Sequence, residues 1–192
     1  MTPQIKLPAA LELEYQRWSD FLRHEVHFAW EGSENHTIEH CTRVLLIALL
    51  LSQQLELAPE LRAVLALACV FHDSRRHDDG LDVGHGQRAA DYYREYCQAH
   101  ELTCDERAYL IMAYHDRNDA LGEAELMELP SGVLLYHLFK DADALDRLRF
   151  GPFDLDVRYL RTEAARTLYP QVRSWWLPLW RAAWPQINWD EG

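Results

Sequence analysis

The sequence predicts an all-α fold, a single-domain helical bundle of about seven helices, and three observations support this prediction. Apolar residues recur at intervals of three and four, and no stretch alternates with period two for long enough to form a strand. The chain has 192 residues, which is enough for one domain with a sizeable core. Its hydrophobic content of 48% and charged content of 26% are typical of a globular protein.

Each helix follows from a local pattern. We expect the first helix over residues 9–28, where apolar residues line one face. Ser33 is the expected cap of a second helix over 34–54, and Pro59 suits the first turn of a third. That third helix is apolar on every side up to Phe71, which is typical of a helix at the centre of a bundle. A fourth helix is expected over 85–100, and a fifth runs from the capping box of Thr103 and Glu106 to His115. One short helix is expected within 116–130. The last two are expected over 132–148, with Ser131 as the cap, and from Asp154 through the tryptophans to residue 184.

Charge and composition exclude several classes of partner. The net charge of -12 argues against stable nucleic-acid binding and against binding to an anionic membrane, because both need a basic surface. The N-terminus lacks the pattern of a signal peptide, and the longest apolar runs, such as Val44 to Leu51, are too short to span a bilayer. The four cysteines show no CxxC spacing, which favours reduced thiols. These features predict a cytoplasmic protein.

Residues with metal-binding chemistry lie where predicted helices begin and end. His72 and Asp73 follow the most apolar helix, so they emerge from the centre of the bundle. Asp143 continues the inward face of its helix, where an unpartnered carboxylate would be costly and a metal ion is the usual partner. His36 and His40 share one face of the second helix, although a lone histidine there is more often a core residue.

The combination is more informative than any one member. A His-Asp dipeptide occurs three times in the chain, so the dipeptide alone indicates nothing. Two imidazoles and two carboxylates without a thiolate suit Mn²⁺, Fe, Mg²⁺, Ni²⁺ or Zn²⁺ and leave coordination positions open for water and substrate. We therefore expect His40, His72, Asp73 and Asp143 to converge on one divalent ion.

In these motifs the sequence resembles the HD superfamily of metal-dependent phosphohydrolases. HCTRV at His40, VFHD at His72 and Asp73, and KDADALD at Asp143 follow the order of that family. The resemblance covers about residues 33–150, and the first helix and the tryptophan-rich helices over 154–184 lie outside it. It implies a helical bundle in which these four residues bind the metal.

The resemblance also implies an activity, the hydrolysis of a nucleotide or another small phosphorylated molecule by a metal-activated water. Asp73 would orient or deprotonate that water, and His115 or His85 would protonate the leaving oxygen. In related proteins, residues placed like these two histidines bind a second metal or hold the substrate phosphate, so one or two ions are expected per chain; at helix ends they could equally be surface residues. The candidate phosphate-binding side chains, besides His85, are Arg75, Arg88 and Lys140.

Alternatives remain open at this stage. Some proteins of this superfamily use a di-iron centre to oxidise carbon with dioxygen, and a bundle that only binds metal or nucleotide is a third reading. The Gly-Tyr-Pro signature of the subgroup that cleaves cyclic di-GMP is not in the sequence. We interpret Asp141 and Asp146 as caps or ion pairs for Arg147 and Arg149, and residues 77–79 as a solvated loop. Arg76 belongs either to that loop or to the pocket mouth, and the tryptophans at 175–184 to the core or to a homodimer contact.

Overall fold

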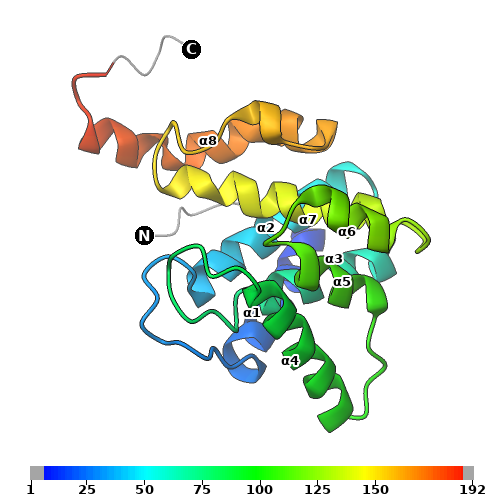
Figure 1. The fold of residues 1–192 in the computed structure, drawn as a ribbon. Coiled ribbons are helices and arrows are strands. Elements are labelled where there is room, and N and C mark those ends of the chain that lie inside the picture. The colour runs from blue at the N-terminus through cyan, green and yellow to red at the C-terminus, as the bar shows by residue number, and fades with distance from the viewer. Residues whose placement is uncertain (1–6, 188–192) are drawn as a thin grey trace.

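The structure, a computed structural model, describes residues 7–187, and these form helices joined by loops. They contain eight α-helices and two short 3-10 helices and no strand, which confirms the all-α prediction (Figure 1). Within the same range, no helix is long and apolar enough to cross a membrane. The elements are α1 Ala9–Glu25, α2 Ile38–Gln54, α3 Pro59–Phe71, α4 His85–Ala99, α5 Glu106–Tyr114, α6 Asp119–Leu126, α7 Gly132–Asp146, η1 Arg147–Arg149, η2 Val157–Tyr159 and α8 Glu163–Ala183.

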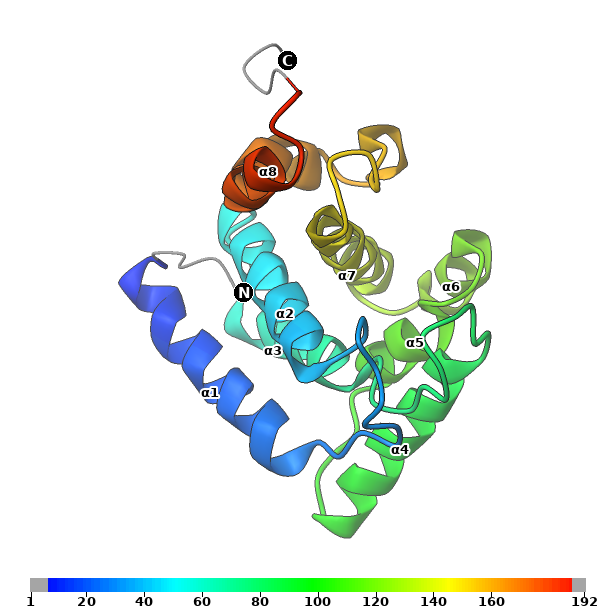
Figure 2. The same cartoon turned by 90° about the vertical axis from the view of Figure 1, so that its left-hand side faces the viewer.

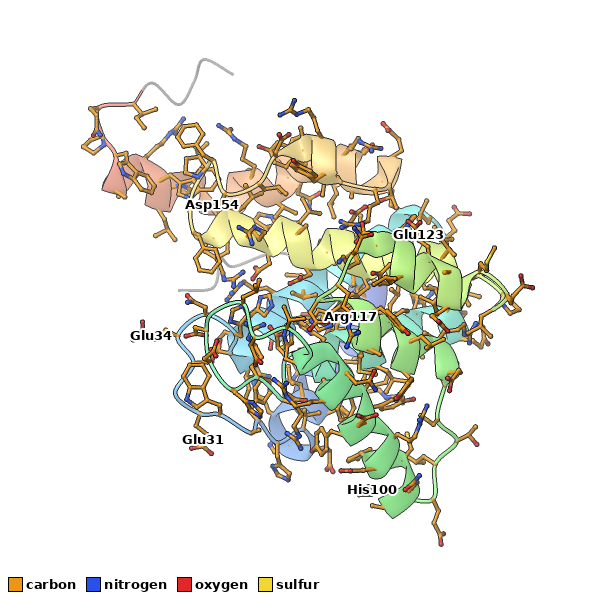
Figure 3. The ribbon with its side chains drawn as sticks, viewed as in Figure 1. Glu31, Glu34, His100, Arg117, Glu123 and Asp154 are labelled. Carbon is orange, nitrogen blue, oxygen red and sulfur yellow. The ribbon has the colours of Figure 1, made fainter. Side chains whose placement is uncertain are left out.

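Helices α2 and α3 form the centre of the bundle. Helix α2 packs against both α3 and α7, and every residue from His40 to Ser52 is buried. Helix α1 covers α2 and α3, α5 packs between α3 and the outer helix α4, and α8 lies across α7 and α2 (Figure 2). Glu31, Glu34 and Asp154 project from the periphery (Figure 3). The prediction that the third helix is central is therefore confirmed.

Helix α2 begins later than the sequence pattern predicts. Thr37 caps it by accepting a hydrogen bond from the backbone N–H of His40 at 3.4 Å. The Ser33 hydroxyl instead accepts from the N–H of His36 within the preceding loop and donates to Asp79. The prediction of Ser33 as the cap was wrong, and the shift places His40 in the first turn of α2.

Three other helix starts also differ in detail. Asp105, not Thr103, caps α5 by accepting from the N–H groups of Arg107 and Ala108. Ser131 occupies the cap position of α7 but makes no side-chain cap bond. The last helix starts at Glu163 rather than near Asp154, because the intervening chain forms a loop with the 3-10 turn η2. The short helix predicted within 116–130 is α6.

Candidate metal centre

Five elements bring their ends together at one buried cluster. His40 lies in the first turn of α2, and His72 and Asp73 directly follow α3. His85 is the first residue of α4, and His115 directly follows α5. All five of these side chains are buried, and the last turn of α7 adds Asp143. The structure brings His40, His72 and Asp73 together, and Asp143 lies beside His40.

The first group of ligand atoms surrounds Nε2 of His40. This atom lies 3.3 Å from Nε2 of His72, 3.4 Å from Oδ2 of Asp73 and 3.3 Å from Oδ1 of Asp143. Two ligands each ~2.1 Å from one ion are about 3.0 Å apart at a right angle and about 3.4 Å apart at a tetrahedral angle. The spacing of His40, His72 and Asp73 therefore fits one ion, and these three residues form a group that could hold it, with Asp143 beside His40. The Asp143 side chain is 36% exposed, so the cluster opens toward solvent on that side.

A second group uses the other oxygen of Asp73. Oδ1 of Asp73 lies 3.0 Å from Nε2 of His85 and 3.7 Å from Nε2 of His115, and those two nitrogens are 2.8 Å apart. These three residues also form a group that could hold a metal ion. Gly86 permits this arrangement, because a Cβ there would lie 2.4 Å from the carbonyl oxygen of Met112, just before His115. Asp73 is thus shared by both groups, with one carboxylate oxygen in each.

All four histidines are oriented in the same way, by an acceptor oxygen that faces Nδ1. The Nδ1 atoms of His72, His85 and His115 face the backbone carbonyls of Cys69, Asp82 and Met112 at 2.9, 2.9 and 2.7 Å. Nδ1 of His40 faces a carboxylate oxygen of Asp146 at 2.8 Å. These oxygens only accept hydrogen bonds, so each ring carries its hydrogen on Nδ1 and directs the lone pair of Nε2 into the cluster. When the rings are neutral, their four Nε2 lone pairs converge beside two carboxylates, which suits a cation, and this is how metal-binding histidines are oriented in proteins.

Asp146 is the member of the site that the sequence analysis missed. Its predicted pairing with Arg149 is confirmed at 2.8 Å, but it also accepts from Nε of Arg43 at 2.7 Å and from His40. A sequence signal existed, because Asp146 lies three residues after Asp143 and Arg43 three after His40, each pair on one helix face.

Asp141 and Arg147, the other aspartate and arginine that were predicted to be caps or ion pairs, have other partners. Arg147 donates to the carbonyl of Asp154 instead of pairing with an aspartate side chain. Asp141 accepts from the backbone N–H groups of Arg161 and Thr162 ahead of α8. Asp141 therefore belongs to the packing of α8 on α7 and takes part in no contact with the cluster among those described.

The electrostatics of the cluster differ from one ligand to the next. Burial lowers the pKa of His40, but hydrogen bonds with Asp143, Asp146 and Asp73 outweigh it and raise that pKa to about 10. Burial lowers the pKa of His72 to about 4, with the charge of Asp73 acting in the opposite direction. Burial also disfavours ionised Asp73, yet the surrounding histidines hold its pKa well below the usual range. The cluster thus combines ionised carboxylates with a histidine that keeps a proton until another cation replaces it.

The three cationic side chains predicted to bind phosphate are engaged by other groups. Arg75 stacks over the ring of Tyr92 at 3.3 Å and donates to the carbonyl of His27. Arg88 pairs with Asp82 at 2.7 Å. Lys140 donates to the carbonyl of His115 at 2.7 Å and pairs with Asp119 at 3.0 Å. Their proposed contact with a substrate remains a prediction.

The cation beside the cluster is the neighbouring residue Arg76. It is buried, and Nη1 lies 3.0 Å from Nε2 of His85 and 3.6 Å from Oδ1 of Asp73. Arg76 is thus neither a solvated loop residue nor part of the lining of a described pocket: it bonds to the carbonyls of the loop and lies against the cluster.

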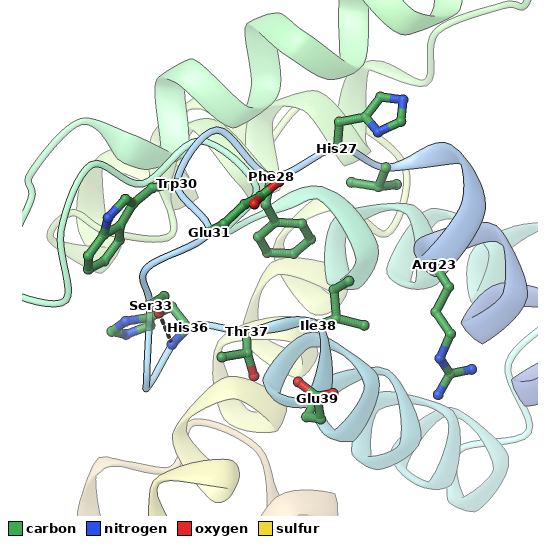
Figure 4. A pocket seen from close by; sticks show the side chains of 11 residues that line it. Arg23, His27, Phe28, Trp30, Glu31, Ser33, His36, Thr37, Ile38 and Glu39 are labelled. Atoms are coloured by element: carbon green, nitrogen blue, oxygen red, sulfur yellow. Dashed lines mark hydrogen bonds between the residues drawn. The ribbon is translucent and has the colours of Figure 1, made fainter.

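Two loops meet next to the cluster. Asp79 accepts from the Ser33 hydroxyl at 2.5 Å and lies 3.0 Å from Nδ1 of His36, so it is part-buried rather than solvated as predicted. The ring of His36 lies edge-on to that of His40, with the centroids 5.8 Å apart. A cavity of about 440 Å³ adjoins His36 between the end of α1, the following loop and the start of α2 (Figure 4). His77 and Asp78 are exposed, as predicted.

Comparison with known proteins identifies no relative. No protein-family model matches the chain, and no curated protein or solved structure matches it. The likeness to the HD superfamily therefore depends on the motif residues alone. Their arrangement is compatible with a site of that type, and what the structure establishes is a pair of buried His/Asp groups that could hold metal.

Proposed function

We propose that this protein is a metal-dependent phosphohydrolase that acts on a nucleotide or another small phosphorylated molecule. The observation that supports it most is the set of four Nε2 lone pairs, fixed from behind, that converge on Asp73 beside Asp143. The HD-type motifs add the reaction class to the metal site. The Asp143 side chain is 36% exposed, and a substrate would approach the centre from its side.

A bound divalent ion lowers the pKa of a coordinated water toward neutrality and polarises a phosphoryl oxygen. The carboxylate of Asp73 would orient that water or help to deprotonate it. His85 and His115 face each other through Nε2 at 2.8 Å while both Nδ1 atoms donate to carbonyls, so the pair can hold a proton at Nε2 and deliver it to the leaving oxygen. The fixed charge of Arg76 offsets negative charge on a phosphoryl group.

A second candidate is a di-iron oxygenase, and one observation favours it. Asp73 offers one oxygen to each of two groups, which is the arrangement of a bridging carboxylate between two metal ions. Such an enzyme would contain iron and consume dioxygen, whereas a hydrolase would release phosphate without it. A bundle that only regulates would bind a nucleotide and leave it intact.

The test is a substrate screen with metal-stripped protein. Nucleotides and phosphomonoesters are incubated with added Mn²⁺, Mg²⁺, Fe²⁺ or Ni²⁺ under anaerobic conditions, and phosphate release is followed. We expect release that depends on the metal. Dioxygen consumption by the iron-loaded protein without phosphate release would support the oxygenase instead, and binding without cleavage would support the regulatory alternative.

A matched pair of variants links any activity to the cluster. Asp73→Asn keeps the size of the side chain but removes its charge, and we expect turnover to fall by at least about 100-fold. Asp20→Asn makes the same change on the exposed surface of α1 and should leave turnover unchanged. Equal activity in both variants would contradict the proposed role of the cluster.

A further inference from the structure

The two oxygens of Asp73 face different surroundings. Oδ2 faces His40 and His72 at 3.4 and 3.5 Å, with no cationic side chain of Lys or Arg among its described contacts. Oδ1 faces His85 and, 3.6 Å away, Nη1 of Arg76. One side of this carboxylate thus already has a permanent positive partner, because a guanidinium stays protonated in proteins.

Arg76 is fixed in this position by the loop that follows it. Its Nε donates to the carbonyl of Asp78 at 3.1 Å, and Nη2 donates to the carbonyl of Gly80 at 2.5 Å. The side chain is only 7% exposed. Two backbone acceptors therefore orient the guanidinium so that Nη1 points to the second group, 3.0 Å from Nε2 of His85.

The charges of the two groups differ accordingly. A dication in the first group would meet two carboxylates, Asp73 and Asp143. A dication in the second group would meet one shared oxygen and two imidazoles, with the charge of Arg76 close to the same ligand atoms. Asp116 approaches His85 only on its Nδ1 side, at 3.6 Å, where it accepts from the N–H of Gly84. Repulsion between like charges at such distances in a buried site is strong.

We propose that the Arg76 guanidinium takes the place of a second cation, so that the centre binds one divalent ion, at His40, His72, Asp73 and Asp143. The group of His85 and His115 then remains free of metal. This inference rests on the metal-binding part of the proposed function. A centre with one ion disfavours the oxygenase alternative, which needs two irons.

The test counts metal ions instead of measuring turnover. Metal-stripped full-length protein is titrated with Mn²⁺, and free Mn²⁺ is measured by electron paramagnetic resonance. We expect about one ion per chain in the wild type and about two in Arg76→Gln, with any second wild-type site at least about 100-fold weaker. Arg76→Lys keeps the charge and should bind one ion. Arg88→Gln removes an arginine from the same region that pairs with Asp82, and it should also bind one.

A second pair of variants keeps the test decisive if circular dichroism shows that Arg76→Gln does not fold. These variants are made in the wild-type chain, which keeps Arg76. His85→Ala should leave both the single ion and its dissociation constant unchanged, whereas His40→Ala should abolish binding. Two ions in the wild type, one ion in a folded Arg76→Gln, or loss of the single ion in His85→Ala would overturn the inference. A wild type that binds two ions leaves the proposed function intact, while one that binds none contradicts both.

Discussion

Each histidine of the candidate metal centre is oriented by an acceptor of its Nδ1 hydrogen, and His40 has the only charged one among the four. Three of the rings donate to backbone carbonyls, but His40 donates to the carboxylate of Asp146 at 2.8 Å. Asp146 is itself held by Arg43 and Arg149 and is 1% exposed. A charge-assisted hydrogen bond of this kind fixes both the tautomer and the ring orientation. We therefore expect Asp146 to position the ring of His40 for a metal ion.

Replacing Asp146 tests that role. Asp146→Asn preserves the shape but removes the charged acceptor, and we expect the affinity for Mn²⁺ to fall by about 10- to 100-fold. The measurement is isothermal titration of metal-stripped protein. Asp141→Asn is the matched control, because Asp141 is equally buried on α7 but accepts a hydrogen bond from the backbone N–H of Thr162, just before α8. Equal losses of affinity in the two variants would show that general destabilisation is the cause.

At this scale the sequence predicts which residues meet in the cluster better than it predicts the groups that hold them. His40, His72, Asp73 and Asp143 lie at helix ends or on an inward face, where periodicity alone indicates burial. Arg75 and Arg76 are consecutive in a segment without periodicity, so the pattern does not indicate which one turns inward. That choice is made by the carbonyls of residues 78 and 80, whose position depends on the folded loop.

At the scale of helices, tertiary contacts decide between adjacent cap residues. Ser33 and Thr37 both have cap chemistry, and Ser33 is withdrawn from that role because it bonds to Asp79, 46 residues away. Before α5, Thr103 and Asp105 compete in the same way, and the hydroxyl of Tyr93 accepts from the N–H of Asp105 at 3.0 Å. Sequence analysis therefore locates these helices but not their first residues.

The cap of α5 offers a direct measurement. Asp105→Ala removes the acceptor for two backbone N–H groups, and we expect the free energy of unfolding in urea to fall by about 1 kcal/mol at pH 7. Thr103→Ala changes the exposed residue that the capping-box pattern predicted, and it should have little effect. A larger loss in Thr103→Ala than in Asp105→Ala would contradict the observed cap.

The same variant has an expected pH dependence. Burial raises the pKa of Asp105, but hydrogen bonds and charge from Arg107, together with the backbone N–H groups, hold it below its ordinary value. A carboxyl with a lowered pKa in the folded state stabilises the fold above its unfolded pKa of about 3.9, and this stabilisation is lost as the pH falls through the folded value. The difference between wild type and Asp105→Ala should therefore be full at pH 7 and shrink steadily below about pH 4. Urea unfolding at several pH values checks this, and a difference that grows in acid would exclude an ionised cap.

At the scale of the whole molecule, the apolar core and the His/Asp cluster have opposite effects on the stability of the fold. The apolar runs of α2 and α3 bury their surface and drive folding, and this part of the fold follows from composition and periodicity. The same two helices bring His40, His72 and Asp73 into the interior, where the desolvation of charge is costly. The predicted fold class is confirmed because it depends on the first effect. A metal ion is expected to offset the second.

Metal should therefore stabilise the entire bundle. A ligand that binds only the folded state at about 100 times its dissociation constant adds about 2.7 kcal/mol to the free energy of unfolding. For a chain of this size we expect Tm to rise by roughly 5 to 10 °C when Mn²⁺ or Ni²⁺ is added to metal-stripped protein, and to return when a chelator is added. Differential scanning calorimetry gives the measurement, and His40→Ala is the control, since it removes the ligand atom that three others surround at 3.3 to 3.4 Å. An equal rise of Tm in His40→Ala would place the ion elsewhere on this acidic chain. If no divalent ion raised Tm, the buried histidines and carboxylates would be stabilised by their own protons and hydrogen bonds alone.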